Sequence, residues 1–177
     1  VSCKNCLVDK SYNKLFIPCW YTGIVRKSIK DLKFNFGFKE RTLIKWIVFN
    51  YLRDNRKFIG NYDIITWVPS NFSCRFTRFV MLPKFISKCV SQFLGVNFKN
   101  LLKKNKTTKF QYKLSKKERI KNVKGAFLCK KDVLGLKILL VDDIITTGST
   151  LNECSAELIK KGAASVDCFA IAKGYFR

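Results

Sequence analysis

Hydrophobic and polar positions along the chain alternate between helix-like and strand-like patterns. Apolar residues spaced three and four positions apart predict helices at residues 22–34, 40–53 and 83–94. Short, uninterrupted apolar runs, typical of strands buried on both faces, predict strands at residues 62–68, 138–141 and 166–172. Strands and helices that alternate in this way predict an α/β fold with a doubly wound, mostly parallel sheet.

The last part of the chain predicts one more helix, between the last two strands. Thr150 and Glu153 have the spacing of a capping box, which predicts the first turn, and Gly162 follows the predicted last turn. An apolar stripe predicts the buried face of this helix, made by Leu151, Cys154, Leu158 and Ile159. Strand, helix and strand lie within about thirty residues, which predicts a βαβ unit.

Two neighbouring carboxylates follow the strand predicted at residues 138–141. Ligands of doubly wound folds bind at the carboxyl ends of the parallel strands, where Asp142 and Asp143 are expected. Ionised carboxylates only accept hydrogen bonds, so the pair suits two neighbouring hydroxyls such as those of ribose. Burying both acids without such a partner would be costly. The pattern therefore predicts a sugar-binding acid pair.

A hydroxyl-rich turn comes next and leads into the predicted helix. Gly148 permits a tight turn, whose backbone N–H groups and hydroxyls can hold a phosphate at a helix N-terminus. The expected phosphate-binding residues are Thr146, Thr147, Gly148, Ser149 and Thr150. The run is not a Walker A motif, because no Gly-x-x-x-x-Gly-Lys is present. The alternative interpretation is a strand-to-helix turn with capping hydroxyls and solvated aspartates.

The run from Ile138 to Thr150 resembles the phosphoribosyl pyrophosphate (PRPP) signature of type I phosphoribosyltransferases. In that signature, two acidic residues and a Thr/Ser-Gly loop follow a hydrophobic strand. Other segments are similar to ComF-type competence proteins, which join this fold to an N-terminal cysteine-rich element. These segments are Tyr21-Thr22-Gly23, Arg26, Leu32-Lys33-Phe34, residues 108–115, Glu118-Arg119 and residues 122–127.

The resemblance implies an activity and a biological role. A nitrogen nucleophile would displace pyrophosphate from the ribose C1 carbon, with Mg²⁺ bridging the diphosphate and the ribose. Asp142 and Asp143 would be the catalytic residues beside a developing oxocarbenium ion, and residues 146–150 would hold the 5′-phosphate. Purine-salvage relatives place an acidic residue where Thr146 stands, so hypoxanthine or guanine is not the expected acceptor. The family also implies a part in DNA uptake.

The resemblance points to two further loops. The fold holds pyrophosphate after its first central strand, where the candidate residues are Ser70, Arg75 and Arg78. ComF-like proteins have an Arg-Gly-Phe-Asn-Gln run at this point, whereas here Arg78 is followed by Phe-Val-Met-Leu. The lysine-rich stretch 105–122 is expected to form a lid over the substrate, and the alternative is a disordered connection. The candidate lid residues are Gln111, Arg119 and Asn122.

The charge of the chain introduces a second functional hypothesis. The 177 residues include 35 Lys and Arg against 12 Asp and Glu, which gives a net charge of +23. Such a field attracts nucleic acid, and Phe110 and Tyr112 offer rings on which bases can stack. The second hypothesis is a non-enzymatic basic adaptor that binds single-stranded DNA or a DNA-uptake helicase, with a vestigial PRPP site. Alternatively, the charge reflects a compositional preference for lysine at surface positions.

Eight cysteines and no histidine limit the metal sites that the chain can build. Cys3 and Cys6 have the spacing of half a structural zinc site, with Cys19 as the nearest third ligand. The alternative is a remnant knuckle or surface thiols. The other cysteines are expected to be small core residues: Cys74, Cys89, Cys129, Cys154 and Cys168.

Length and apolar content predict one main domain with a small appendage. We expect a partial zinc-knuckle-like segment at residues 1–20, a helical hood segment at 21–58 and a phosphoribosyltransferase-like domain at 59–177. Trp20 and Trp46 are expected to be core or hood aromatics. No apolar stretch has the length of a transmembrane helix and no signal-peptide pattern is present, so we expect a cytoplasmic protein without membrane insertion.

Overall fold

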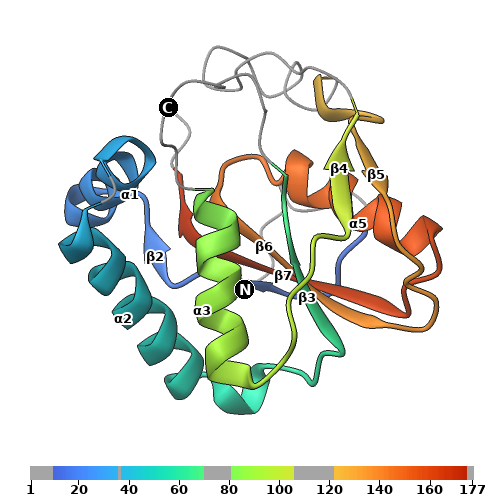
Figure 1. The fold of residues 1–177 in the computed structure, drawn as a ribbon, viewed down its shortest axis with the longest axis horizontal. Coiled ribbons are helices and arrows are strands. Elements are labelled where there is room, and N and C mark those ends of the chain that lie inside the picture. The colour runs from blue at the N-terminus through green and yellow to red at the C-terminus, as the bar shows by residue number, and fades with distance from the viewer. Residues whose placement is uncertain (1–9, 36, 70–80, 106–121, 175–177) are drawn as a thin grey trace.

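The computed structural model describes residues 10–35, 37–69, 81–105 and 122–174 (Figure 1). Its helices are α1 (Gly23–Asn35), α2 (Phe38–Asp54), the short 3-10 helix η2 (Arg56–Phe58), α3 (Leu82–Leu94) and α5 (Ser149–Lys160). Its strands are β1 (Leu15–Phe16), β2 (Cys19–Trp20), β3 (Ile64–Trp67), β4 (Leu102–Lys104), β5 (Phe127–Cys129), β6 (Lys137–Ile145) and β7 (Ser165–Lys173). The helices and strands predicted from the hydrophobic pattern are all present.

The main sheet of the described residues is parallel throughout. Its order is β1-β7-β6-β3, and β2 also pairs with β7. In the register of the sheet, Trp67 of β3 is opposite Val141 of β6, which in turn is opposite Phe169 of β7. The carboxyl ends of these parallel strands therefore lie at the same edge of the sheet. The chain leaves β3 at this edge, next to the carboxyl-terminal part of β6. The predicted α/β fold with a mostly parallel sheet is confirmed.

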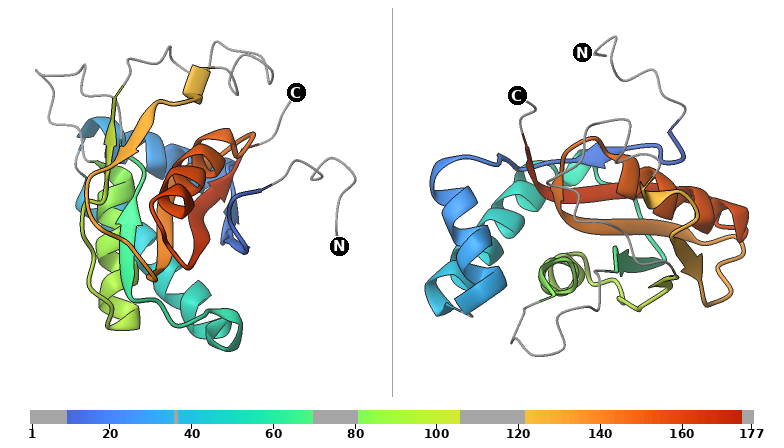
Figure 2. Two further views of the ribbon diagram at one scale, coloured as in Figure 1. Left: turned by 90° about the vertical axis from the view of Figure 1, so that its right-hand side faces the viewer. Right: turned by 90° about the horizontal axis from the view of Figure 1, so that it is seen from above.

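Helices cover the sheet on both faces, because alternate residues of each strand point to opposite sides. Ile138 and Leu140 of β6 belong to a core shared with α5, β4 and β5. Leu139 and Val141 belong to a second core, shared with α1, α2 and α3. Figure 2 shows α3 and α5 on opposite sides of β6 and β7. Strands with two buried faces explain why β6 and β7 have apolar runs and not an alternating pattern.

A small second sheet, which the hydrophobic pattern does not predict, lies at the base of the expected lid. β4 and β5 pair antiparallel, with Leu102 opposite Cys129 and Lys104 opposite Phe127. The two ends of the lysine-rich stretch are thereby held side by side. Two glutamates of α5 fix this base to the helix, because Glu153 Oε1 accepts a hydrogen bond from Gly125 N and Glu157 Oε1 accepts one from Cys129 N.

The described part of the N-terminal segment joins the main sheet. Leu15 of β1 is opposite Cys168 of β7, and Cys19 of β2 is opposite Ala172 of the same strand. Residues 10–20 therefore extend the parallel sheet, while residues 1–9 lie outside the described part of the chain. Among the helices of the described residues, none combines the length and the apolar character needed to span a bilayer.

Of the core and hood alternatives for Trp20 and Trp46, the core alternative is wrong. Trp46 is 62% exposed and Trp20 is 50% exposed. Trp46 is two positions from both Ile44 and Val48, which are fully buried, so it lies on the opposite side of α2. The core prediction is confirmed for Cys89, Cys154 and Cys168, which are buried, whereas Cys129 is only half-buried and Cys74 lies outside the described residues.

Candidate functional site

The acid pair lies within β6 and not after it. The sequence predicts a strand that ends at Val141, but β6 continues to Ile145 because β7 offers pairing partners up to Lys173. Asp142 is opposite Ala170 of β7 and is only 9% exposed. The pair still lies near the carboxyl end of a central parallel strand, where ligands of this fold class bind.

Backbone hydrogen bonds fix the direction of both carboxylates. Asp142 Oδ1 accepts a hydrogen bond of 2.8 Å from the amide of Asp143. Asp143 Oδ1 accepts one of 2.8 Å from the amide of Ile144. Each acid is thus held by the residue that follows it, which leaves little freedom for the side chains to reorient.

A lysine from a distant helix completes this cluster. Lys33 Nζ, in the last turn of α1, lies 2.5 Å from Asp143 Oδ2. The neighbouring Leu32 is fully buried and anchors this turn of α1 in the core. The local sequence around Lys33 predicts no role for this lysine in the site. The only signal was its place in the Leu32-Lys33-Phe34 run, which is similar to the ComF pattern.

Burial and neighbouring charges set the protonation of the cluster. Burial raises the pKa of Asp142 well above its usual range, and the charge of Asp143 raises it further, while Lys33 opposes the shift. Burial alone would lower the pKa of Lys33, but the attraction of Asp143 raises it overall. Lys33 is therefore charged, and Asp142 keeps its proton to an unusually high pH. A protonated Asp142 can donate one hydrogen bond to a ligand as well as accept others.

The predicted phosphate loop leads into α5. Gly148 is the N-cap of this helix with φ +77°, and the helix begins at Ser149, one residue before Thr150. The capping box expected from Thr150 and Glu153 is therefore wrong, since Glu153 accepts a hydrogen bond from Gly125 instead. Thr147 Oγ1 lies 2.8 Å from Ser149 Oγ, so these two hydroxyls point toward each other within the loop. The first N–H groups of a helix attract anions, which suits a phosphate at this turn.

The loop depends on glycine at position 148. The backbone at position 148 is left-handed, a conformation that residues with a side chain rarely adopt. A Cβ at this position would lie 3.4 Å from Ile145 Cδ1 and 3.6 Å from the Tyr12 hydroxyl. We expect Gly148→Ala to lower the free energy of unfolding by about 1 kcal/mol and to weaken sugar-phosphate binding. Urea denaturation and calorimetry measure the two effects.

A matched control separates backbone strain from an effect on the site. Gly135 also has a left-handed backbone, with φ +71°, but a Cβ at this position meets no atom within 4 Å. Gly135→Ala should cost a similar amount of stability and leave ligand affinity unchanged. Equal affinities of the two variants for the sugar phosphate would contradict the role given to Gly148.

The other predicted site residues contribute less to the described geometry. Asn122 is half-buried just before β5. Several candidates lie outside the described residues: Cys3, Cys6, Ser70, Arg75, Arg78, Gln111 and Arg119.

Zinc and magnesium place different demands on the described residues. Burial raises the pKa of the Cys19 thiol, which disfavours the thiolate that zinc needs, and zinc binding by Cys3, Cys6 and Cys19 stays a prediction. Asp142 and Asp143 are the right type of ligand for Mg²⁺. However, Lys33 and two backbone amides already engage three of their four carboxylate oxygens. With Lys33 in this position the pair does not fit a divalent cation.

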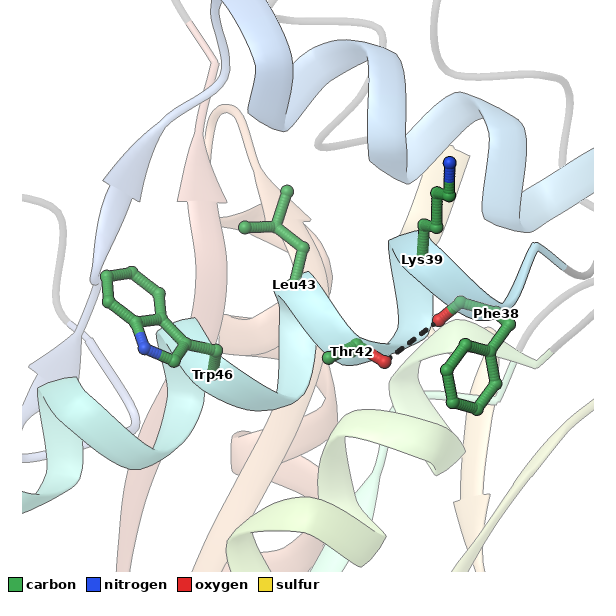
Figure 3. A pocket seen from close by; sticks show the side chains of 5 residues that line it. All are labelled: Phe38, Lys39, Thr42, Leu43 and Trp46. Carbon is green, nitrogen blue, oxygen red and sulfur yellow. Dashed lines mark hydrogen bonds between the residues drawn. The ribbon is translucent and has the colours of Figure 1, made fainter.

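A separate hollow lies on the outer face of α2 (Figure 3). It has a volume of about 400 Å³ and is lined by Phe38, Lys39, Thr42, Leu43 and Trp46. Phe38 is 83% exposed, and Thr42 Oγ1 donates a hydrogen bond to its carbonyl oxygen. All lining residues come from α2, so this hollow is not part of the site on β6.

Comparisons with known proteins show the family to which the chain belongs. The family model of the phosphoribosyl transferase domain matches residues 97–174, which include β6, the loop and α5. Competence protein F of Haemophilus influenzae is 32% identical over 179 residues, which cover 97% of this chain and 78% of that protein. Competence protein ComFC of Bacillus subtilis is 30% identical over 135 residues, which cover 66% of this chain and 56% of that protein.

Among solved structures, a purine phosphoribosyltransferase from Pyrococcus horikoshii Ot3 is 16% identical, with a TM-score of 0.43, and the match covers 91% of this chain and 79% of that one. The parallel sheet, the acid pair of β6 and the matching family model define a protein of the phosphoribosyltransferase fold class. More particularly, the chain belongs to the family of ComF-type competence proteins.

Proposed function

We propose that the chain binds PRPP, or a related sugar phosphate, at the acid pair and the loop that follows it. The main support is a nearly buried acid pair on a central strand, placed directly before a glycine turn at a helix N-terminus. Burying two adjacent carboxyl groups is unfavourable for stability, so their presence at this position favours a functional role.

In the proposed complex each part of the ligand meets a matching group. The 5′-phosphate accepts hydrogen bonds from the backbone and hydroxyls of residues 146–150, at the positive end of α5. The ribose hydroxyls donate to the carboxylate of Asp143, and the protonated carboxyl of Asp142 both donates and accepts. Mg²⁺ belongs to the proposal as the counter-ion of the diphosphate, because phosphate oxygens are among its preferred ligands.

If the chain is an enzyme, the reaction is transfer of the phosphoribosyl group to a nitrogen acceptor with release of pyrophosphate. Such a reaction depends on positioning and electrostatic stabilisation more than on a covalent intermediate. Thr146 supplies no carboxylate that could accept a proton from a purine base. The acceptor is therefore a nucleophile that needs no carboxylate base from this position.

We also propose a part in DNA uptake, because the relatives that match most of the chain are named competence proteins. The net charge of +23 gives such a protein a strong attraction for DNA. The same charge supports the second candidate, a basic adaptor that binds single-stranded DNA without catalysing transfer.

Calorimetry with PRPP tests the first proposal. Titration of the wild-type protein should release heat with PRPP in the presence of Mg²⁺, and more weakly with ribose 5-phosphate, which lacks the diphosphate. An absence of heat with both ligands would contradict the proposal. If PRPP binds, release of pyrophosphate upon addition of nucleobases distinguishes an enzyme from a binding protein.

The salt dependence of DNA binding tests the adaptor. Three exposed lysines lie in or next to the β4–β5 sheet: Lys103, Lys124 and Lys130. Changing all three to glutamine should reduce the slope of log affinity against log salt by about 2, because each phosphate contact contributes about 0.7 on single strands. A control triple variant changes exposed lysines elsewhere: Lys27, Lys57 and Lys160. Equal slopes for both triple variants would show that the β4–β5 surface has no specific part in binding.

A further inference from the structure

We propose that Lys33 is a built-in cation of the acid pair: its ammonium group occupies the position that a divalent metal ion would take on Asp143. While α1 holds this lysine in place, the pair binds no metal ion. Removing the lysine converts the pair into a metal site. The proposal concerns the same acid pair as the proposed sugar site, but it can be tested without any sugar phosphate.

The geometry of the ion pair is the first support. Lys33 Nζ and Asp143 Oδ2 are 2.5 Å apart, and the side chains are 38% and 15% exposed. This is not a contact between two free surface side chains, whose ion pairs contribute little. Ile29 and Leu32 of the same helix are fully buried, so α1 delivers the lysine from a fixed position.

The state of the other carboxylate oxygens is the second support. Asp142 Oδ1 and Asp143 Oδ1 each accept a backbone hydrogen bond. Mg²⁺ binds in proteins through one or two carboxylates together with oxygen atoms of a substrate. Within the described part of the chain, no third acidic or cysteine side chain joins the pair to form a metal-binding group. Lys33 holds one of the two carboxylate oxygens that accept no backbone hydrogen bond, so a metal ion that bridges the pair competes with the lysine.

Electrostatics make the two cations mutually exclusive. A divalent ion on Asp143 would lie within a few ångströms of the lysine ammonium group, in a partly buried site where screening by salt is weak. Repulsion between the two then offsets much of the attraction of the one carboxylate that they would share. Substitution of Lys33 by an uncharged side chain removes the repulsion and frees the oxygen in one step.

Manganese binding in the absence of sugar tests the proposal. Mn²⁺ uses the same hard oxygen ligands as Mg²⁺, and its electron paramagnetic resonance signal reports the free ion. Lys33→Met should bind Mn²⁺ at least about tenfold more tightly than the wild type. Lys30→Met is the matched control, because Lys30 is exposed on the same helix and its removal changes the net charge equally. This control should bind Mn²⁺ as weakly as the wild type.

Three further variants keep the test decisive. Lys33→Arg retains the charge and should behave like the wild type, whereas adding Asp143→Asn to Lys33→Met should abolish the new Mn²⁺ site. Asp143→Asn alone should leave the weak Mn²⁺ binding of the wild type unchanged, a result that does not require the Lys33 variant to fold. Tight binding by the wild type that Asp143→Asn removes would overturn the proposal, as would equal affinities of Lys33→Met and Lys30→Met. None of these outcomes depends on whether PRPP binds.

Discussion

Replacing both acids, Asp142→Asn together with Asp143→Asn, should weaken PRPP binding by about a hundredfold or more. A hydrogen bond to a charged group contributes about 1.5–3 kcal/mol, and each 1.4 kcal/mol corresponds to about a tenfold change in affinity. The double variant removes the charged acceptor of Asp143 and replaces the carboxyl of Asp142, which donates and accepts hydrogen bonds in the proposed complex, by an amide. Calorimetric titration with PRPP and Mg²⁺ measures the change.

A control must account for the altered charge of the variant. Because Asp142 keeps its proton, the acid-pair variant removes one negative charge, and Asp132→Asn removes one at an exposed position. This control should bind PRPP like the wild type, and circular dichroism should show that both variants are folded. If the acid-pair variant retains wild-type affinity while it is folded, the sugar is not held by Asp142 and Asp143.

The ion pair between Lys33 and Asp143 also bears on the choice between enzyme and binding protein. An ammonium group beside Asp143 opposes the positive charge that develops on ribose during transfer. Binding of PRPP itself is affected less, because the ligand is an anion. The acid pair with Lys33 in place is thus better suited to binding than to transfer. A catalytic form of the protein would need Lys33 to leave Asp143.

The architecture was predictable from sequence where the apolar pattern is strong. β6 and β7 are buried on both faces, and their continuous apolar runs indicated a parallel sheet covered by helices. The ends of elements were less predictable. β6 extends through Asp142 and Asp143 because β7 lies alongside, and a partner strand is not visible in the local sequence. For the same reason, the short strands β4 and β5 were missed.

The candidate site was predictable where consecutive residues form it. Asp142, Asp143 and Gly148 stand close together in the chain, so the local pattern brought them to the end of β6 and the start of α5, although both acids lie within the strand and not after it. Lys33 reaches the same site from 110 positions away, through the packing of α1. Tertiary packing also determines the hydrogen bond of Glu153, which accepts from the backbone amide of Gly125 and not from the first turn of α5. Contacts of this kind depend on the whole fold and leave no periodic signal in the sequence.

Asp142 should lower the stability of the protein as the pH rises. Burial raises its pKa in the folded state, whereas the unfolded chain releases the proton near the ordinary value of about 3.9. Below that value Asp142 is protonated in both the folded and the unfolded state, so it does not make the free energy of unfolding depend on pH. Above it the unfolded state ionises freely and the folded state does not, so stability falls until the folded pKa is reached.

Asp142→Asn should therefore stabilise the protein near neutral pH, by about 1–2 kcal/mol. Asparagine keeps an oxygen that can accept the hydrogen bond from Asp143 N, and it has no charge to lose on burial. Urea denaturation should show a small gain near pH 4.5 that increases toward pH 7.5, while Asp132→Asn at an exposed position shows no such trend. A loss of stability at pH 7.5 would mean that Asp142 is ionised and structurally required. A gain of stability that accompanies a loss of PRPP binding would indicate that this carboxyl is retained for its ligand and not for the fold.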